Sequence, residues 1–154
     1  RALGAAMAAC APPGAEVVTW VPLTRRRKAR RGFDQAEVLA VAVGRATGLP
    51  VRGLLRRAVS TGPQAKRDAL SRRVAMRGAF VVRERAIVPG AVLLVDDVLT
   101  TGATAAACAE ALLAHGVTRV TLVVAARALL RAGRRAYTHP GPRPGLWLPG
   151  DHPR

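Results

Sequence analysis

The sequence contains few aromatic residues and few of the side chains that bind metals. Aromatic residues make up 3% of its 154 residues although half are hydrophobic, so a folded core has to be built from Ala, Val and Leu. Two cysteines and three histidines occur without the spacing of a zinc site, and we expect a reducing, cytoplasmic compartment. Cys108 lies near Leu112 at the spacing of core residues in an Ala-rich stretch, which predicts a buried thiol rather than a reactive one.

Long apolar segments are also missing. No apolar run approaches the ~18 residues of a membrane span, and residues 1–10 lack the strongly hydrophobic centre of a signal peptide, so we expect neither. The length fits a single domain. We predict one domain over residues 1–154 with its core at 17–126 and an irregular Pro- and Gly-rich tail at 138–154.

Acidic residues are scarce. Nine Asp and Glu stand against 25 Lys and Arg, which gives a formal net charge of +16, and residues 25–85 hold 17 of the basic side chains and four of the acidic ones. A field of this sign favours anionic partners, whether polyphosphates, nucleic acid or anionic lipid. A genome rich in Arg and Ala codons explains the preference for Arg over Lys but not the clustering, and both explanations stay open.

The most informative segment is Val92–Thr104, which reads VLLVDDVLTTGAT. Its apolar run suits a strand buried on both faces of a parallel sheet, and Asp96 and Asp97 follow where open α/β sheets bind ligands. The Thr/Gly stretch opens a helical pattern, whose free N–H groups and hydroxyls suit a phosphate. Carboxylates bind sugar hydroxyls or Mg²⁺ instead, so the segment predicts a site for a phosphorylated sugar. The alternative is a strand that ends in a solvated acidic turn, with Thr as a helix cap.

The rest of the chain alternates between short apolar runs and helical patterns. This alternation predicts a mostly parallel sheet flanked by helices, with right-handed crossovers. The expected strands are 17–21, 53–57, 79–82, 91–95 and 117–126, and the expected helices are 1–10, 32–47 and 102–115.

The acid pair and Thr/Gly stretch resemble the phosphoribosyl-pyrophosphate signature of type I phosphoribosyltransferases. With VPLT and RRGFDQ before it, and Gln64 and Arg72 ahead of RGAF, the pattern resembles the ComF family of competence-associated proteins over about residues 17–126. The resemblance implies an α/β, type I phosphoribosyltransferase-like fold with a flexible hood loop at about 58–77. Asp34 and Ala75 stand where the family pattern has Asn. Members usually begin with a four-Cys zinc module, which two cysteines cannot supply.

The resemblance also implies roles for individual residues. Asp96 and Asp97 would be catalytic and would bind the ribose 2′- and 3′-hydroxyls. Mg²⁺ would be bound mainly through the substrate, without a metal site made by the protein alone. The 5′-phosphate would be held by Thr100, Thr101, Gly102, Ala103 and Thr104, the pyrophosphate by Thr24, Arg25, Lys28 and Arg31, and the hood would contribute Gln64 and Arg72.

Two classes of function follow from this resemblance. The first is an enzyme that binds phosphoribosyl pyrophosphate and transfers the phosphoribosyl group to a nucleobase-like acceptor. The second is a non-catalytic, nucleotide-sensing protein that contacts single-stranded DNA weakly. Of the few aromatic residues only Phe33 lies near the basic 25–31 segment, which argues against a base-stacking platform but permits contact with phosphates.

Overall fold

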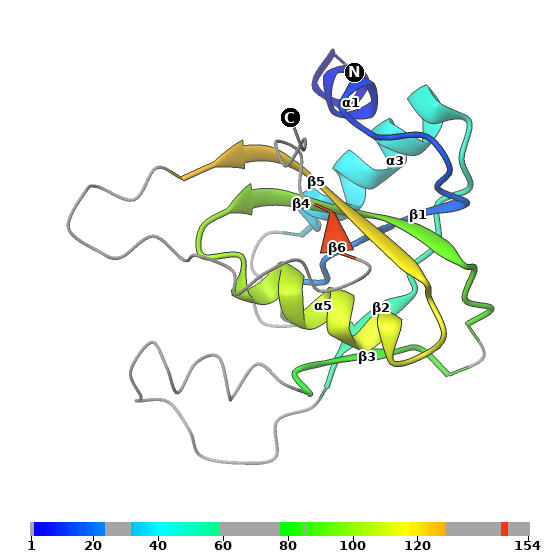
Figure 1. Cartoon of the computed structure of the whole chain (residues 1–154). Helices are drawn as coiled ribbons and strands as arrows, with labels where there is room; N and C mark the ends of the chain where they lie inside the picture. The colour runs from blue at the N-terminus through cyan, green and yellow to red at the C-terminus, as the bar shows by residue number, and fades with distance from the viewer. Residues whose placement is uncertain (1, 24–31, 59–77, 85, 129–145, 148–154) are drawn as a thin grey trace, which may run out of the picture.

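The computed structural model describes residues 2–23, 32–58, 78–84, 86–128 and 146–147 (Figure 1). Helices and strands alternate along most of this part of the chain. In chain order they are α1 (Ala2–Ala9), β1 (Val17–Trp20), α3 (Gln35–Thr47), β2 (Leu55–Arg57), β3 (Phe80–Val82), β4 (Ala91–Leu99), α5 (Ala103–Leu113), β5 (Arg119–Arg127) and β6 (Leu146–Trp147).

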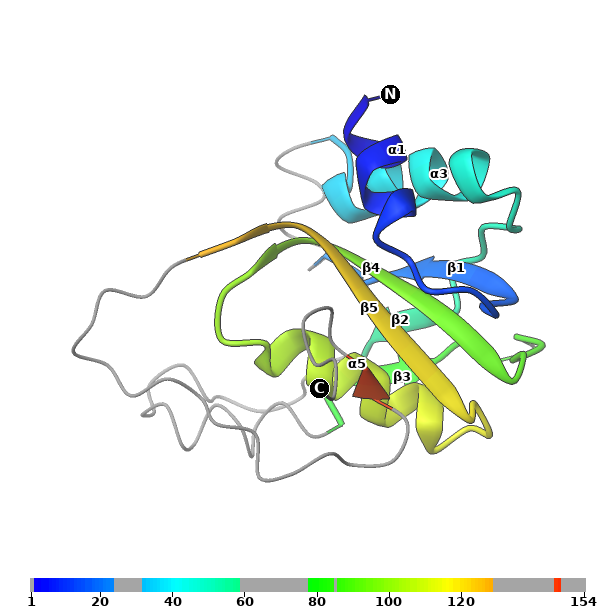
Figure 2. The same ribbon diagram turned by 45° about the horizontal axis from the view of Figure 1, so that its top comes forward.

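The centre of the fold is a parallel sheet of four strands in the order β1-β4-β5-β6. β4 is paired on both sides, with Val95 opposite Trp20 of β1 and Val123 of β5. Helices α1 and α3 cover one face of the sheet, and α5 covers the other (Figures 1 and 2). The predicted α/β fold, with a mostly parallel sheet between helices, is therefore confirmed.

Alternating side chains of β4 pack into two separate hydrophobic clusters, one on each face of the sheet. Leu93 and Val95 pack in the cluster below α1 and α3, whereas Val92 and Leu94 pack in the cluster around α5. All four are almost completely buried. Burying each such side chain contributes ~1.5–3 kcal/mol. The buried residues of the described chain are mainly Ala, Val and Leu, as the composition predicted.

Strands β2 and β3 do not join the parallel sheet but form an antiparallel pair of their own. The chain first runs beside β1, where Val51 makes a single bridge to Val18. It then passes the Trp20 ring at Gly53, where an added Cβ would lie 3.0 Å from a ring carbon. A larger residue at 53 would therefore crowd the ring. Sequence alternation alone did not predict this departure from the sheet.

Most boundaries differ from those predicted by one or two residues, and three differences matter more. α3 begins at Gln35 rather than at residue 32, because Asp34 caps it. β4 extends to Leu99, so the two acids lie inside the strand rather than beyond it. Residues 146–147, expected in an irregular tail, pair with Val120 and Thr121 as β6, since β5 offers a free edge there.

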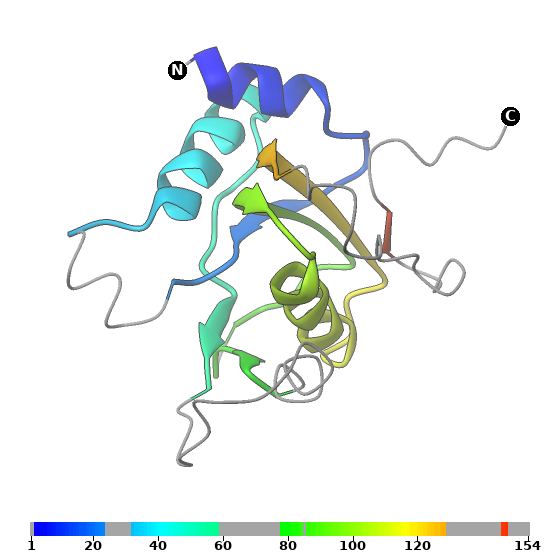
Figure 3. The ribbon, with the colours of Figure 1, turned by 90° about the vertical axis from the view of Figure 1, so that its left-hand side faces the viewer.

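The N-terminal helix is part of the packed structure. α1 lies against α3 (Figure 3), and Gly4 permits the contact because a Cβ at this position would overlap Ala42. Met7 of α1 is buried in the same cluster as Leu93. Among the described residues, no helix is long and apolar enough to cross a membrane.

The two cysteines should differ in reactivity. Cys10 is exposed, whereas Cys108 is buried. Burial raises the pKa of the Cys108 thiol, and the charge of Asp96 raises it further. Because the thiolate is the reactive form, we expect Cys10 to react rapidly with an aromatic disulfide reagent and Cys108 to react only after unfolding. Cys10→Ser should remove the fast phase. Rapid reaction of both thiols in the folded protein would contradict the packing of α5.

Candidate functional site

The acid pair lies at the carboxyl end of the central strand. Asp96 and Asp97 are half-buried, whereas the preceding residues of β4 are buried. The carboxylate of Asp96 accepts a hydrogen bond from the Asp97 N–H at 2.9 Å, and that of Asp97 accepts one from the Val98 N–H at 2.8 Å. Strand alternation turns the two side chains toward opposite faces, with Asp96 on the side of Val92 and α5. A ligand at this edge would therefore meet the two carboxylates from different sides.

Asp96 has an unusual protonation equilibrium. The pKa of its carboxyl is raised from 3.8 to about 7, chiefly by burial. The hydrogen bond from the Asp97 N–H acts in the opposite direction and lowers this pKa. The negative charges of Asp97 and, to a smaller extent, Asp34 also raise it. Carboxyls with strongly raised pKa values at the edge of a sheet are more frequent at functional sites than elsewhere.

The Thr/Gly loop follows the acids and leads into α5. Thr100 and Thr101 are exposed, and Gly102 caps the helix with a positive φ of 74° that L side chains rarely adopt. The hydroxyl of Thr101 accepts a hydrogen bond of 3.4 Å from the Ala103 N–H. The first turn of α5 thus brings N–H groups and hydroxyls to the end of β4, which is the donor set that binds a phosphate.

The carboxyl end of β1 lies beside this loop edge. The Val21 N–H donates to the Val95 carbonyl at 3.0 Å, so the chain leaves β1 next to Asp96. It returns at Asp34, whose carboxylate accepts hydrogen bonds from the N–H groups of Leu23 and Ala36. The intervening segment is the one to which the sequence assigns pyrophosphate contacts.

The sequence patterns did not identify Asp34 as the residue that caps α3 and accepts a hydrogen bond from Leu23. It was read only as a departure from the family's Asn, inside a helix expected from residue 32. The signal was present: Asp34 is followed three residues later by Glu37, the spacing of a helix capping box. Such a pair indicates a helix start at residue 35, which is where α3 begins.

The β2–β3 pair forms the base of the segment predicted as a hood. The Ala58 N–H donates to the Ala79 carbonyl at 2.9 Å, which brings the two ends of that segment together. Arg57 stacks on the Phe80 ring at 4.7 Å, and its charge lowers the pKa of Cys108 while that of Asp96 raises it. The base of the hood segment therefore lies on the α5 side of the sheet.

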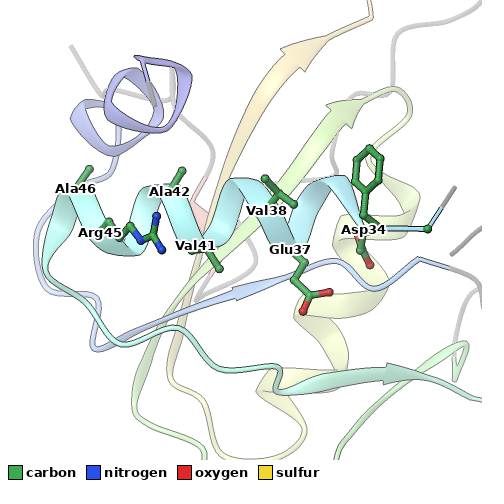
Figure 4. Close-up of a pocket in the computed structure, with 9 residues that line it drawn as sticks. Asp34, Glu37, Val38, Val41, Ala42, Arg45 and Ala46 are labelled. Carbon is green, nitrogen blue, oxygen red and sulfur yellow. The ribbon is translucent and has the colours of Figure 1, made fainter.

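A hollow of about 800 Å³ follows the outer side of α3 rather than the acid pair (Figure 4). Asp34 lies at one end of it and Arg45 near the other. Neither of the two acids of β4 lines it, and no residue of the Thr/Gly loop does. The predicted acid pair and phosphate loop therefore lie at the sheet edge and not in this hollow.

The structure brings the predicted acids and the predicted phosphate loop together in one place. Asp96 and Asp97 lie in the last part of β4, and residues 100–102 connect this strand to α5. The other predicted site residues lie outside the described part of the chain, which leaves their roles as predictions. They are Thr24, Arg25, Lys28, Arg31, Gln64 and Arg72.

The chain is similar to a curated protein in sequence. Competence protein F of Haemophilus influenzae is 33% identical over 116 residues, which are 73% of this chain and 51% of that protein. The chain is therefore a distant homologue of competence protein F. It spans about half the length of this curated relative. A search against family models gave no match.

Solved structures with the same fold include enzymes of nucleotide synthesis. The glutamine phosphoribosylpyrophosphate amidotransferase of B. subtilis, complexed with ADP and GMP, is 26% identical with a TM-score of 0.56. This match covers 80% of the present chain and 25% of the amidotransferase chain. A structure described as the allosteric regulatory enzyme of purine biosynthesis gives the same TM-score and identity, and 24% of its chain is covered. This chain therefore has the fold of the phosphoribosyltransferase domain of such enzymes.

The stability of the protein should depend on the ionisation of Asp96. The folded state keeps the Asp96 proton up to about pH 7, whereas the unfolded chain releases it near 3.8. Between these values the folded state binds more protons, so its free energy of unfolding falls as the pH rises and levels off above about 7. Asp96→Asn cannot ionise, and we expect its unfolding temperature, relative to the parent, to rise over this range and then stay constant.

Thermal unfolding followed by circular dichroism between about pH 4 and 8 measures this difference. In Asp97→Asn the fall should be smaller than in the parent, because one charge that raises the pKa of Asp96 is gone. If the difference in unfolding temperature between Asp96→Asn and the parent stayed constant with pH, this would show that Asp96 is solvated.

Proposed function

We propose that this protein binds phosphoribosyl pyrophosphate with Mg²⁺ and transfers the phosphoribosyl group to a nucleobase-like acceptor. The observation that carries the proposal lies at the sheet edge, where the Asp96–Asp97 pair in the last part of β4 is followed, after Val98 and Leu99, by the loop that begins α5. The likeness to a phosphoribosylpyrophosphate amidotransferase supports this class of ligand.

The two parts of the site suit different parts of this ligand. Asp96 and Asp97 would accept hydrogen bonds from the ribose hydroxyls, which are donors without charge. The 5′-phosphate would be bound by N–H groups and hydroxyls of the Thr100–Thr104 loop at the positive end of the α5 dipole. The acids would not contact the phosphate, because they lie on β4 and the N–H groups and hydroxyls that would bind the phosphate come after this strand.

The segments that flank this edge would complete the site. The pyrophosphate would be neutralised by the segment after β1, through Thr24, Arg25, Lys28 and Arg31. Gln64 and Arg72, from the segment between β2 and β3, would cover the bound ligand. Covering the site would exclude water, which otherwise hydrolyses the donor.

Mg²⁺ would be held mainly by oxygens of the ligand. In the part of the chain that the structure describes, no group of three or more His, Cys, Asp or Glu side chains is placed to hold a metal ion. Carboxylate oxygens are nevertheless the donors that Mg²⁺ accepts, so the acidic edge is compatible with an ion that enters with its substrate. Such an ion would neutralise charge on the departing pyrophosphate.

In the reaction itself, the bond between ribose C1 and the pyrophosphate would break through a cationic transition state. Negative charge from the acid pair would stabilise the positive ribose ring. A carboxyl with a pKa of about 7 is matched to accept a proton near neutral pH, and Asp96 would take it from the acceptor.

A second candidate is a non-catalytic protein that senses the same ligand and contacts single-stranded DNA. The excess of positive charge in residues 25–85 supports it, and so does the relation to a competence protein. Within the described chain, Arg52, Arg56 and Arg83 expose their side chains near the β2–β3 pair. Arg56 pairs with Glu84 at 3.5 Å, but both side chains are well exposed and such a pair contributes little.

Removing both acids tests the proposed ligand site. Asp96→Asn/Asp97→Asn keeps the shape but removes charged acceptors of hydrogen bonds, and we expect a loss of at least ~1–3 kcal/mol in binding of phosphoribosyl pyrophosphate with Mg²⁺. Isothermal titration calorimetry measures this loss, and release of pyrophosphate on adding nucleobases distinguishes an enzyme from a sensor. Equal affinity in the variant and the parent would reject the site.

The second candidate predicts binding of DNA that depends on salt and not on sequence. Arg26→Ala/Arg27→Ala/Lys28→Ala should reduce the slope of log affinity against log salt by up to ~2 units, because each phosphate contact on a single strand contributes ~0.7. Fluorescence anisotropy with labelled single strands measures the slope, and phosphoribosyl pyrophosphate should compete. An unchanged slope would exclude this segment as a DNA contact. Absence of binding at low salt would leave the small-molecule function alone.

A further inference from the structure

The loop proposed to bind the 5′-phosphate supplies hydrogen-bond donors but no positive charge. Residues 100–104 are Thr, Thr, Gly, Ala and Thr, and the first turn of α5 contains no charged side chain. The charged groups that precede the loop on β4 are the carboxyl groups of Asp96 and Asp97. A phosphate in this loop would therefore lie near groups of its own sign, and the repulsion between them is reduced when a cation lies beside the phosphate.

The carboxyl end of β5 brings a cation to this loop. Arg127 is the last residue of β5 and lies in register with Leu99, the residue before Thr100. The Ala128 N–H donates to the Leu99 carbonyl at 2.9 Å, so the two chains stay paired up to the start of the loop. The ends of β4 and β5 lie side by side (Figures 1 and 2). Neighbouring strands are about 4.8 Å apart, a separation that an arginine side chain spans.

The guanidinium of Arg127 is available to a ligand. The residue is exposed, and among the described residues no ion pair involves it. Arg119, the first residue of the same strand, differs in this respect because its guanidinium donates a hydrogen bond to the Gly14 carbonyl. A guanidinium binds phosphate through two parallel hydrogen bonds and keeps its charge at any physiological pH. The backbone of Arg127 is thus fixed by the sheet, and its side chain has the chemistry that the loop lacks.

We propose that Arg127 is a further ligand-binding residue of this edge, whose guanidinium neutralises the 5′-phosphate held by the loop at residues 100–104. This inference rests on the proposed function. It adds a residue of β5 to a site otherwise formed by β4 and the start of α5. Because N–H groups and hydroxyls also bind uncharged oxygens, Arg127 would be the residue that selects phosphorylated sugars over neutral ones.

The order of the strands separates this role from binding of pyrophosphate. β1 and β5 lie on opposite sides of β4. The proposed function assigns the pyrophosphate to the β1 side, whereas Arg127 lies on the β5 side. Replacing Arg127 should therefore affect ligands that carry the 5′-phosphate and leave binding of pyrophosphate unchanged.

Isothermal titration calorimetry on the full chain, with ribose 5-phosphate and separately with pyrophosphate and Mg²⁺, tests this role. We expect Arg127→Gln to weaken binding of ribose 5-phosphate by at least about tenfold, the scale of one lost hydrogen bond to a charged group. The affinity for pyrophosphate should change by less than about twofold. Arg127→Lys keeps the charge but not the two parallel bonds, and should recover part of the lost affinity.

A matched control lies at the other end of the same strand. Arg119→Gln removes the same charge from β5 at the opposite edge of the sheet. At about 3.3 Å per residue the two arginines are roughly 25 Å apart, which is several times the screening length of about 8 Å at physiological ionic strength. The control should therefore leave both affinities unchanged. An equal loss of ribose 5-phosphate binding in Arg119→Gln and Arg127→Gln would show that net charge alone matters, and would overturn the proposal.

The unfolding temperature separates a binding role from a structural one. Because Arg127 is exposed, Arg127→Gln should unfold at the same temperature as the parent when followed by circular dichroism. Unchanged affinity for ribose 5-phosphate in this variant would overturn the proposal, and so would an equal loss for both ligands.

Failure of this inference can be distinguished from failure of the proposed function. If the parent binds phosphoribosyl pyrophosphate with Mg²⁺ and Arg127→Gln binds ribose 5-phosphate as the parent does, the role of Arg127 is rejected and the proposed function stands. A parent protein that binds neither phosphoribosyl pyrophosphate nor ribose 5-phosphate would show that the proposed function is wrong, and the inference would fall with it.

Discussion

The structure depends on the burial of β4. This strand is hydrogen-bonded on both sides, to β1 and β5, and is covered by apolar side chains on both faces. Five successive residues, Ala91–Val95, are buried, and only the last part of the strand reaches the surface. Asp96 and Asp97 are placed where this burial ends, so they are partly withdrawn from water without being enclosed. The same packing that stabilises the fold therefore raises the pKa of Asp96.

The parallel arrangement determines which segments meet the acids. In a parallel sheet all carboxyl ends lie along one edge. The chain leaves β1 beside Val95, whereas β4 continues past the acid pair to Leu99. Asp34 then joins the chain that leaves β1 to the start of α3, and Gly102 turns the chain that leaves β4 into α5. The β2–β3 pair lies on the α5 side of the sheet. The topology of the fold therefore brings residues that are distant in sequence close to one another.

The similarity of this chain to known proteins supports its fold more strongly than an activity. The match to the amidotransferase covers one quarter of that enzyme, so the same fold serves there as one part of a larger chain. Half of competence protein F likewise lies beyond the aligned region. A shared fold accommodates different functions. The argument for function therefore rests on Asp96, Asp97 and the loop before α5, whose chemistry suits a phosphorylated sugar.

The central strand, the acid pair and the Thr/Gly loop were predictable from the sequence alone because each is a local feature. The apolar run, the two acids and the Thr/Gly loop are consecutive, and strand and helix periodicity is visible over windows of this length. The helix predicted at 32–47, which begins at residue 35 in the structure, the strand that follows α5 and the burial of Cys108 were predicted for the same reason. The ComF resemblance was also carried by short motifs, and the comparisons confirmed it.

Features that depend on contacts between residues far apart in the sequence are visible in the tertiary structure alone. Strand patterns do not specify a partner, so the separation of β2 and β3 and the pairing of residues 146–147 with β5 were not visible. The pKa of Asp96 follows from burial beneath elements far along the chain. The second hydrogen bond of Asp34 joins residues eleven apart. Sequence shows which side chains are available, but desolvation and long-range hydrogen bonds arise only when packing excludes water and brings distant groups together.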